Sequence, residues 1–235
     1  MLNRGVALMV FALVAGAAQP AAAQQTINLN LGYFAVRGED ARVEDDVLNE
    51  NLNFFAFDVS DFNTGSIGGE WLVPLGGYVE AGAGIGFTRR TVPSVYSEFV
   101  DRTDGSEIEQ DLRLRTVPMA LTFRVLPLGQ ASGVQPYLGG GLGVIAWRYS
   151  ETGEFIDPQS VIFREQYVAS GSATGPVALG GIRFGGDSVA AGFEVRYQSA
   201  DAELGTRFSS SDLPDPRIDL GGWTYQVNVG FRFGR

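Results

Sequence analysis

The side chains that most often carry enzyme chemistry are missing from this chain. Its 235 residues include no histidine and no cysteine. Histidine suits proton transfer near neutral pH, and histidine or a thiolate completes most nucleophilic and transition-metal sites. Serine and aspartate are plentiful, but no histidine base is present to activate them. The composition therefore predicts a protein that is not an enzyme, with no cofactor and no metal centre.

Charged residues recur instead on the polar parity of segments in which apolar and polar side chains alternate. Successive side chains of a strand point to opposite faces, so in a closed barrel with an apolar exterior these charges would point inward. Side chains nearly fill a narrow barrel, and a buried charge without a partner is costly. We expect a glutamate–arginine network that plugs one half of the lumen; the alternative is that some of these charges reach water at the barrel mouth. The residues are Glu70, Glu80, Arg124, Arg183, Glu194, Arg196 and Arg232.

Eight segments carry the period of two that positions these charges. The clearest is Gly222 to Phe233, where Trp223 and Tyr225 begin an apolar parity that ends in an aromatic pair. In the fifth segment glycines occupy both faces, and we expect Leu138 and Leu142, with Val144, to point outward. The predicted strands are 26–33, 66–75, 78–90, 111–125, 135–149, 172–184, 189–198 and 222–233.

The connections between these strands alternate strictly in length. Short turns rich in glycine or proline occupy 74–77, 127–133 and 185–188, and long connections occupy 38–62, 91–110, 150–171 and 199–221. Transmembrane barrels have an even number of antiparallel strands, short periplasmic turns and longer extracellular loops. The sequence therefore predicts an all-β, eight-stranded antiparallel transmembrane β-barrel with both termini in the periplasm and the charge network in its periplasmic half. Residues 52–59 could extend the second strand beyond the membrane.

Aromatic residues on the apolar parity fit the girdles that such barrels place at the lipid interfaces. Their alternative is core packing in a soluble sandwich. The proposed interface aromatics are Tyr33, Trp71, Trp223, Phe231 and Phe233.

Glycines gather on the inward parity, at 82, 84 and 86 and again at 139, 141 and 143. One explanation is that they permit the strong coiling of strands in a small barrel. The other is that they leave space for a cavity or a thin pore.

The first 23 residues have the organisation of a secretory signal peptide. Arg4 provides a positive start, Val6 to Val14 is an apolar run, and Ala21 to Ala23 offer a cleavage site. Residues 24–235 then form one barrel domain. The net charge of −10 argues against nucleic acid as a partner. The acidic first loop, with Glu44 to Asp46, offers oxygen ligands for divalent cations, but its spacing matches no EF-hand, and a charge run of this kind is usually just solvated.

The sequence resembles the small outer-membrane β-barrel family of the OmpA, OmpX and OmpW type. The resemblance rests on the signal peptide, on glycine-rich strands such as 79–86 and 136–143, and on the closing Gly230-Phe231-Arg232-Phe233. It covers essentially all of residues 24–235. It implies a place in the bacterial outer membrane, contact with outer-membrane lipid and lipopolysaccharide, and recognition by the barrel-assembly machinery. The family usually ends on the aromatic residue, whereas Gly234 and Arg235 follow here.

Three functions fit these patterns. The first is a structural or surface-interaction role through the long extracellular loops, with a surface ligand that the sequence does not identify. The second is a narrow pore for small or apolar solutes. The third is a soluble periplasmic barrel whose apolar parity faces an apolar ligand inside.

Overall fold

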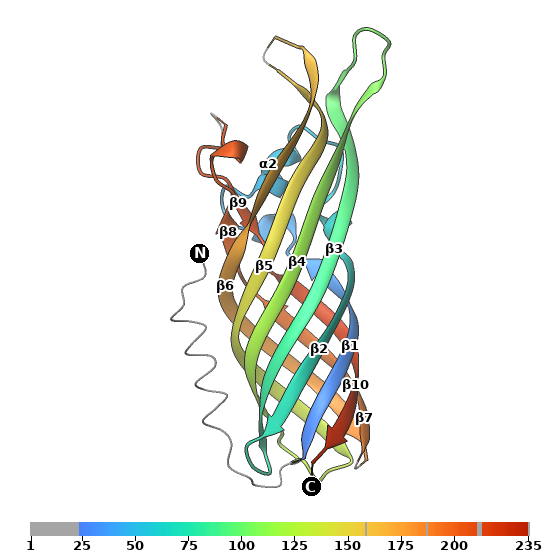
Figure 1. Ribbon diagram of the computed structural model, residues 1–235, viewed down its shortest axis with the longest axis vertical. Helices are drawn as coiled ribbons and strands as arrows, with labels where there is room; N and C mark the ends of the chain where they lie inside the picture. Colours follow the sequence, from blue (N-terminus) through green and yellow to red (C-terminus); the bar gives the residue numbers. More distant parts are fainter. Residues whose placement is uncertain (1–23, 158, 187, 211–212, 235) are drawn as a thin grey trace.

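The computed structural model describes residues 24–157, 159–186, 188–210 and 213–234, so the predicted signal peptide, 1–23, lies outside the described residues. Eight antiparallel strands close into a barrel in the order β1-β10-β7-β6-β5-β4-β3-β2 (Figure 1). Their bounds are β1 Gln25–Val36, β2 Thr64–Pro74, β3 Val79–Val100, β4 Glu107–Val125, β5 Val134–Ile156, β6 Ile162–Gly185, β7 Val189–Gln198 and β10 Gly222–Phe233. The predicted all-β, eight-stranded antiparallel barrel is confirmed.

The ring closes between the first and the last strand. Gln25 at the start of β1 lies opposite Phe233 at the end of β10, and their pairing continues to Val36 opposite Gly222. Closure satisfies the backbone groups that an open edge would expose. Both strand ends therefore lie at the end of the barrel that carries the short β2–β3 turn (Figure 1). No helix in the described parts of the chain is both long and apolar enough to cross a membrane.

Four strands rise well beyond the others on one side of the barrel (Figure 1). β3 continues to Val100 and β4 begins at Glu107, while β5 continues to Ile156 and β6 begins at Ile162. The predicted loops 91–110 and 150–171 are therefore wrong in most of their length, since two extended hairpins occupy them. The period of two continues above the belt, but its apolar residues now face inward. Val92 in the predicted loop is buried, and so are Leu112 and Leu114 at the start of the next predicted strand. Strands whose apolar residues face inward lack the outward apolar parity from which the membrane strands were predicted.

The remaining long connections fold over the barrel mouth. The first contains the helix α2 (Val47–Asn51) and two 3-10 turns, η1 (Glu39–Ala41) and η2 (Val59–Phe62). The last contains the paired short strands β8 (Asp201–Glu203) and β9 (Arg217–Asp219), with the turn η3 (Thr206–Phe208). The predicted extension of the second strand over 52–59 is wrong, because this stretch follows α2 and ends in η2.

An apolar cluster, here called the mouth core, joins these connections to the tall strands. It contains Leu48 and Phe62 from the first connection, Leu204 and Ile218 from the last, and Leu112, Trp147 and Tyr149 from the strands. Asp46 starts α2 by accepting hydrogen bonds from the backbone N–H groups of Leu48 and Asn49. The upper interior is thus packed like the core of a soluble protein.

Shortening Leu48 to alanine tests whether the first connection is held by this core. Leu48 is fully buried, and such a truncation typically costs about 2–5 kcal/mol. We expect faster proteolysis within residues 38–62 of Leu48→Ala, while the folded barrel keeps its heat-modifiable migration on a gel. The matched control is Leu31→Ala, whose side chain is 63% exposed on the barrel exterior. Equal cleavage rates in the two variants would contradict this packing.

Candidate functional site

The exterior of the barrel is apolar and its interior is polar. Exposed apolar side chains cover the wall of the barrel below the tall hairpins: Ile27, Leu29, Leu31, Ile67, Ile85, Leu121, Phe123, Leu138, Leu142, Val189, Phe193, Val227 and Val229. Buried polar side chains face the inside: Thr26, Asn28, Ser66, Thr122, Gln135, Gln226 and Asn228, with the charged residues described below. Exposing this much apolar surface to water would be strongly unfavourable, whereas a surface that contacts lipid has to be apolar.

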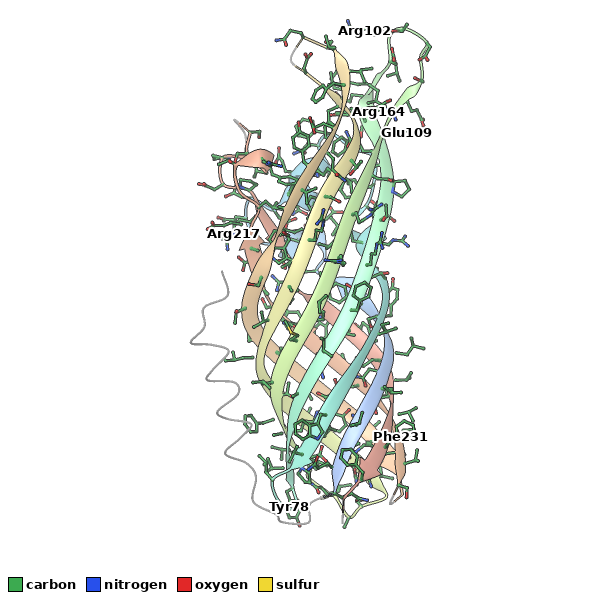
Figure 2. The ribbon with its side chains drawn as sticks, in the orientation of Figure 1. Tyr78, Arg102, Glu109, Arg164, Arg217 and Phe231 are labelled. Atoms are coloured by element: carbon green, nitrogen blue, oxygen red, sulfur yellow. The ribbon has the colours of Figure 1, made fainter. Side chains whose placement is uncertain are left out.

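The five predicted interface aromatics all point outward, and they lie at two levels. Trp71 and Phe231 both lie opposite Ile27 near the short-turn end, where Phe233 also lies. Tyr33 lies opposite Tyr225 at the other level, and Trp223 packs on Tyr197 with ring centroids 4.8 Å apart. Figure 2 shows Phe231 pointing away from the barrel near its lower end. The two levels border the apolar belt as girdles do.

Four of the seven predicted charges meet at the centre of the lumen. Arg124 on β4 donates from Nη2 to Glu70 Oε2 on β2 at 2.5 Å and to Glu194 Oε2 on β7 at 2.6 Å. Arg196 donates to Glu70 Oε1 at 3.0 Å and to Glu194 Oε1 at 2.8 Å. These four residues, here called the central ion group, carry two positive and two negative charges, so the group is neutral.

Uncharged side chains complete the central ion group. Tyr137 donates its hydroxyl to Glu194 at 3.1 Å, and its ring lies 4.8 Å from the guanidinium carbon of Arg124. Gln226 donates to the other oxygen of Glu194 at 2.9 Å. Neither residue was predicted from the sequence, although each falls on the inward parity of its strand. Each carboxylate of the group is satisfied by several donors, which buried charges require.

The other predicted charges form a separate group near the short-turn end. Arg183 contacts Glu80 through two hydrogen bonds of 2.6 and 3.3 Å, and its Nε donates to Gln135 Oε1 at 2.8 Å. Arg232 donates to the same Gln135 oxygen at 3.1 Å and to the carbonyl of Gly186 at 2.8 Å. The expected single network is therefore divided in two, and Gln135 was a member that the sequence analysis missed.

Inward glycines make room for these side chains. A Cβ atom added at Gly82 would lie 3.2 Å from Glu70 Oε1 and 2.7 Å from Thr122 Oγ1, and one added at Gly181 would lie 2.6 Å from the Tyr137 hydroxyl. Above the central ion group remains a cavity of about 60 Å³, lined in part by Arg196, Thr88, Phe34 and Leu220. Glu70 and Arg124 thus occupy the space beside Gly82, Gly84 and Gly139, whereas the neighbours of Gly86, Gly141 and Gly143 lie outside the ion groups.

A second set of buried charges ties the first connection to the last. Arg42 donates two hydrogen bonds to the carboxylate of Asp46, at 2.7 and 3.0 Å. Asp46 also accepts a hydrogen bond from the backbone N–H of Asp219 at 2.6 Å. Asp219 in turn pairs with Arg37 at 2.8 Å. Asp46 therefore serves a structural role within the acidic first loop, and no cluster of metal-binding side chains occurs among the described residues.

The outer side of the mouth carries a hollow whose walls include seven aromatic side chains. Its volume is about 700 Å³, and it opens between α2, the tall strands and η3. The aromatic residues are Phe54, Phe55, Tyr96, Phe99, Phe155, Tyr167 and Phe208. Glu151 lies at its floor, where its Oε1 accepts hydrogen bonds from Asn51 at 2.7 Å and Tyr149 at 2.9 Å. Burial raises the pKa of the Glu151 carboxyl, and these hydrogen bonds oppose the shift.

A closed ring of eight antiparallel strands with an apolar exterior, aromatic girdles and a charged interior is the architecture of outer-membrane β-barrels. The chain is therefore a β-barrel of the bacterial outer membrane, as the sequence predicted. No protein-family model and no curated protein matches the sequence.

Several solved structures are similar in fold. Ail, the attachment invasion locus protein of Yersinia pestis, in complex with the heparin analogue sucrose octasulfate, is 14% identical, with 90% of this chain and 99% of that chain covered and a TM-score of 0.40. The N-terminal β-barrel domain of Pseudomonas aeruginosa OprF is 15% identical, with 89% and 97% covered and a TM-score of 0.40. A major outer membrane protein from Thermus thermophilus is 11% identical, with 90% and 100% covered and a TM-score of 0.44. At such identities no functional residue is carried over to this chain.

Replacing Arg124 by glutamine tests the central ion group. Removing one partner of a buried ion pair leaves the other charge uncompensated and costs about 3–5 kcal/mol. We expect Arg124→Gln to lower the free energy of unfolding by about 3–5 kcal/mol, measured by urea unfolding in lipid vesicles. Arg164→Gln is the control, because its side chain is 83% exposed and exposed pairs contribute little. Equal effects of the two substitutions would contradict the arrangement.

Replacing Glu151 by glutamine tests the buried carboxyl outside the membrane. Because the pKa of Glu151 is raised on folding, the carboxyl favours the folded state at acidic pH, and this contribution is lost as the pH rises through the folded pKa. We expect the mouth core of the wild type to resist proteolysis less at about pH 8 than at about pH 4.5. Glu151→Gln, which keeps an oxygen acceptor, is expected to reduce this difference, and an unchanged pH dependence would argue against it.

Proposed function

We propose that this protein is a non-conducting outer-membrane barrel that acts through its extracellular surface, in a structural or surface-interaction role. The observation that carries the proposal is the filling of the lumen at three levels, the lowest being the contact of Arg183 with Glu80 near the short-turn end. The central ion group occupies the membrane-spanning part, and the mouth core occupies the part above it. Between them lies a cavity of about 60 Å³, the space of very few water molecules.

The central ion group obstructs passage because its members come from opposite parts of the ring. In the ring order, β7 is separated from both β2 and β4 by two strands. The contacts of Glu194 and Arg196 on β7 with Glu70 and Arg124 therefore bridge the lumen. The side chains of Arg124, Glu70 and Glu194 are each at most 2% exposed. A solute would have to break several charge-assisted hydrogen bonds to pass.

The alternative functions fit less well. A narrow pore would need all three levels of filling to open. A soluble barrel for an apolar ligand would place its apolar parity inside, whereas Leu138 and Leu142 are 70% and 67% exposed on the outside. Catalysis would need a base and a nucleophile in a site without histidine or cysteine, so we propose that the protein is not an enzyme.

Features of the extracellular side support a role in surface interaction. The aromatic hollow of about 700 Å³ is open to the outside, and aromatic walls suit the recognition of ligands or partner surfaces. The upper part of β6 pairs with β5 on one side, whereas its pairing with β7 covers only Val177 to Gly185. Within the described chain, the upper edge of β6 is thus left without a strand partner, and such edges can accept a further strand.

The proposed orientation places both termini and the short turns in the periplasm, with the tall hairpins outside the cell. This orientation follows the general rule that extracellular loops are the long ones. Outer-membrane lipid and lipopolysaccharide then surround the apolar belt, and the barrel-assembly machinery inserts the chain. The partner of the aromatic hollow is a surface ligand whose chemistry the wall residues leave open.

Conductance across a planar lipid bilayer tests the proposal. We expect no conductance steps from the purified wild-type protein, because three levels of filling close the lumen. Replacing the central ion group by alanine in the fourfold variant E70A/R124A/E194A/R196A removes one barrier without changing the net charge, and we expect this variant to stay closed. Adding E80A/R183A and shortening residues 39–62 to a flexible linker in the same variant removes the other two barriers and should give conductance.

Heat-modifiable gel migration identifies which variants are folded before they are tested. A second measurement is the release of small dyes from vesicles that contain the wild-type protein, which does not require any variant to fold. Regular conductance steps or rapid dye release from the wild type would overturn the proposed closed barrel and favour the pore.

A further inference from the structure

We propose that three outward arginines, Arg89, Arg115 and Arg148, form a binding site for the phosphate groups of an outer-leaflet glycolipid such as lipid A. The proposal rests on the outer-membrane orientation proposed above, which places these residues on the extracellular side. The three lie on β3, β4 and β5, neighbouring strands that rise side by side on the near face of the barrel in Figure 1.

Strand register brings the three side chains together. Arg89 lies directly opposite Arg115, and Arg115 lies directly opposite Arg148. Directly opposed residues of antiparallel strands share a face, and their Cα atoms are about 4.5–5.5 Å apart. The guanidinium groups therefore form one continuous positive row. Like charges in opposed positions destabilise a sheet unless something compensates them.

No carboxylate in the part of the chain that the structure describes supplies a counter-charge to this row. All three arginines are exposed, and no carboxylate of the described residues makes an ion pair with them within 4.0 Å. The row does not lack carboxylate partners for want of acidic residues, because the chain has 27 acidic residues against 17 arginines and carries a net charge of −10. Elsewhere arginines such as Arg37, Arg42 and Arg183 are paired with carboxylates. An anion from outside the chain would compensate the row.

The row lies where the apolar belt ends. On the same outward faces, Phe87 precedes Arg89 and Met119 follows Arg115, and both are about two-fifths exposed at 40% and 39%. Beyond the row on β4 comes Arg113, which donates to the Thr91 hydroxyl at 3.0 Å and adds a fourth cation. The carboxylate of Asp111 lies further from the belt on the same face. A lipid whose acyl chains cover the belt would hold its phosphates at the level of this row.

The chemistry of the row selects phosphate. Guanidinium groups bind phosphate oxygens through pairs of parallel hydrogen bonds, and three or four adjacent forks can hold two phosphate groups at once. The outer leaflet of such a membrane offers a lipid with two phosphates on one sugar headgroup and several acyl chains. Contacts of the chains with the belt and of the phosphates with the row would act together, since each fixes the position of the other.

Binding of purified lipid A tests the site. The detergent-solubilised full-length protein is titrated with bisphosphorylated lipid A, with the same lipid lacking both phosphates, and with inorganic phosphate as competitor. We expect the wild type to bind the bisphosphorylated lipid more than about tenfold more tightly than the dephosphorylated one. The triple variant R89Q/R115Q/R148Q is expected to lose this preference, and higher salt should weaken only the binding of the phosphorylated lipid.

A charge-matched control separates local from overall electrostatics. The triple variant R102Q/R164Q/R207Q removes three exposed arginines far from the belt, of which Figure 2 labels Arg102 and Arg164 near the top of the tall hairpins. This control should keep the wild-type preference. Equal preference in the two triple variants, or displacement by inorganic phosphate at the same concentration as lipid A, would overturn the lipid site. Conductance does not enter this measurement, so a failure here is distinguishable from a failure of the closed-barrel proposal.

Discussion

Contact with lipid is the constraint on which the rest of this structure depends. Because lipid takes the apolar side chains of the lower wall, such as Leu29 and Leu138, the polar side chains of the same strands must face one another inside. Charges confined in this way need partners, and Arg124 and Arg196 find them in Glu70 and Glu194 across the lumen. Above the membrane the constraint ends and the strands reverse their sense, with apolar residues such as Leu112 packed inside against the first and last connections. One chain thus contains two opposite arrangements on continuous strands.

This reversal explains what could be predicted from the sequence. Within the belt the period of two and the short turns were sufficient to predict eight strands and the faces of Glu70, Arg124 and Phe231. The tall hairpins escaped prediction because their apolar residues, such as Val92, lie on the parity that is polar below. The partners of individual charges also could not be predicted, because a contact such as that of Arg183 with Glu80 depends on which strands face one another across the closed ring. For uncharged residues such as Tyr137 the sequence indicates only that the side chain faces inward, and not which charged residue it contacts.

The mouth core gives a fixed surface to the side of the barrel that is proposed to be extracellular. Asp46 is the centre of this arrangement, because it caps α2, pairs with Arg42 and accepts the backbone N–H of Asp219. The first and last connections are thereby joined by buried charges as well as by apolar contacts. A binding surface on such a base loses little conformational entropy on binding a ligand, whereas long free loops would lose much more. The aromatic hollow and the upper edge of β6 are thus presented on a rigid support.

The pairing of β1 with β10 has a consequence for the order of assembly. Gln25 and Phe233 are partners at almost opposite ends of the folded sequence, and Asp46 meets Asp219 in the same way above them. Neither the seam nor the joined connections can form until the C-terminal strand is available. Contacts of such large sequence separation slow folding, because the loop must close before any of them is gained. The unassembled chain therefore has to be kept from aggregating through its exposed strand edges until β10 is available to pair with β1.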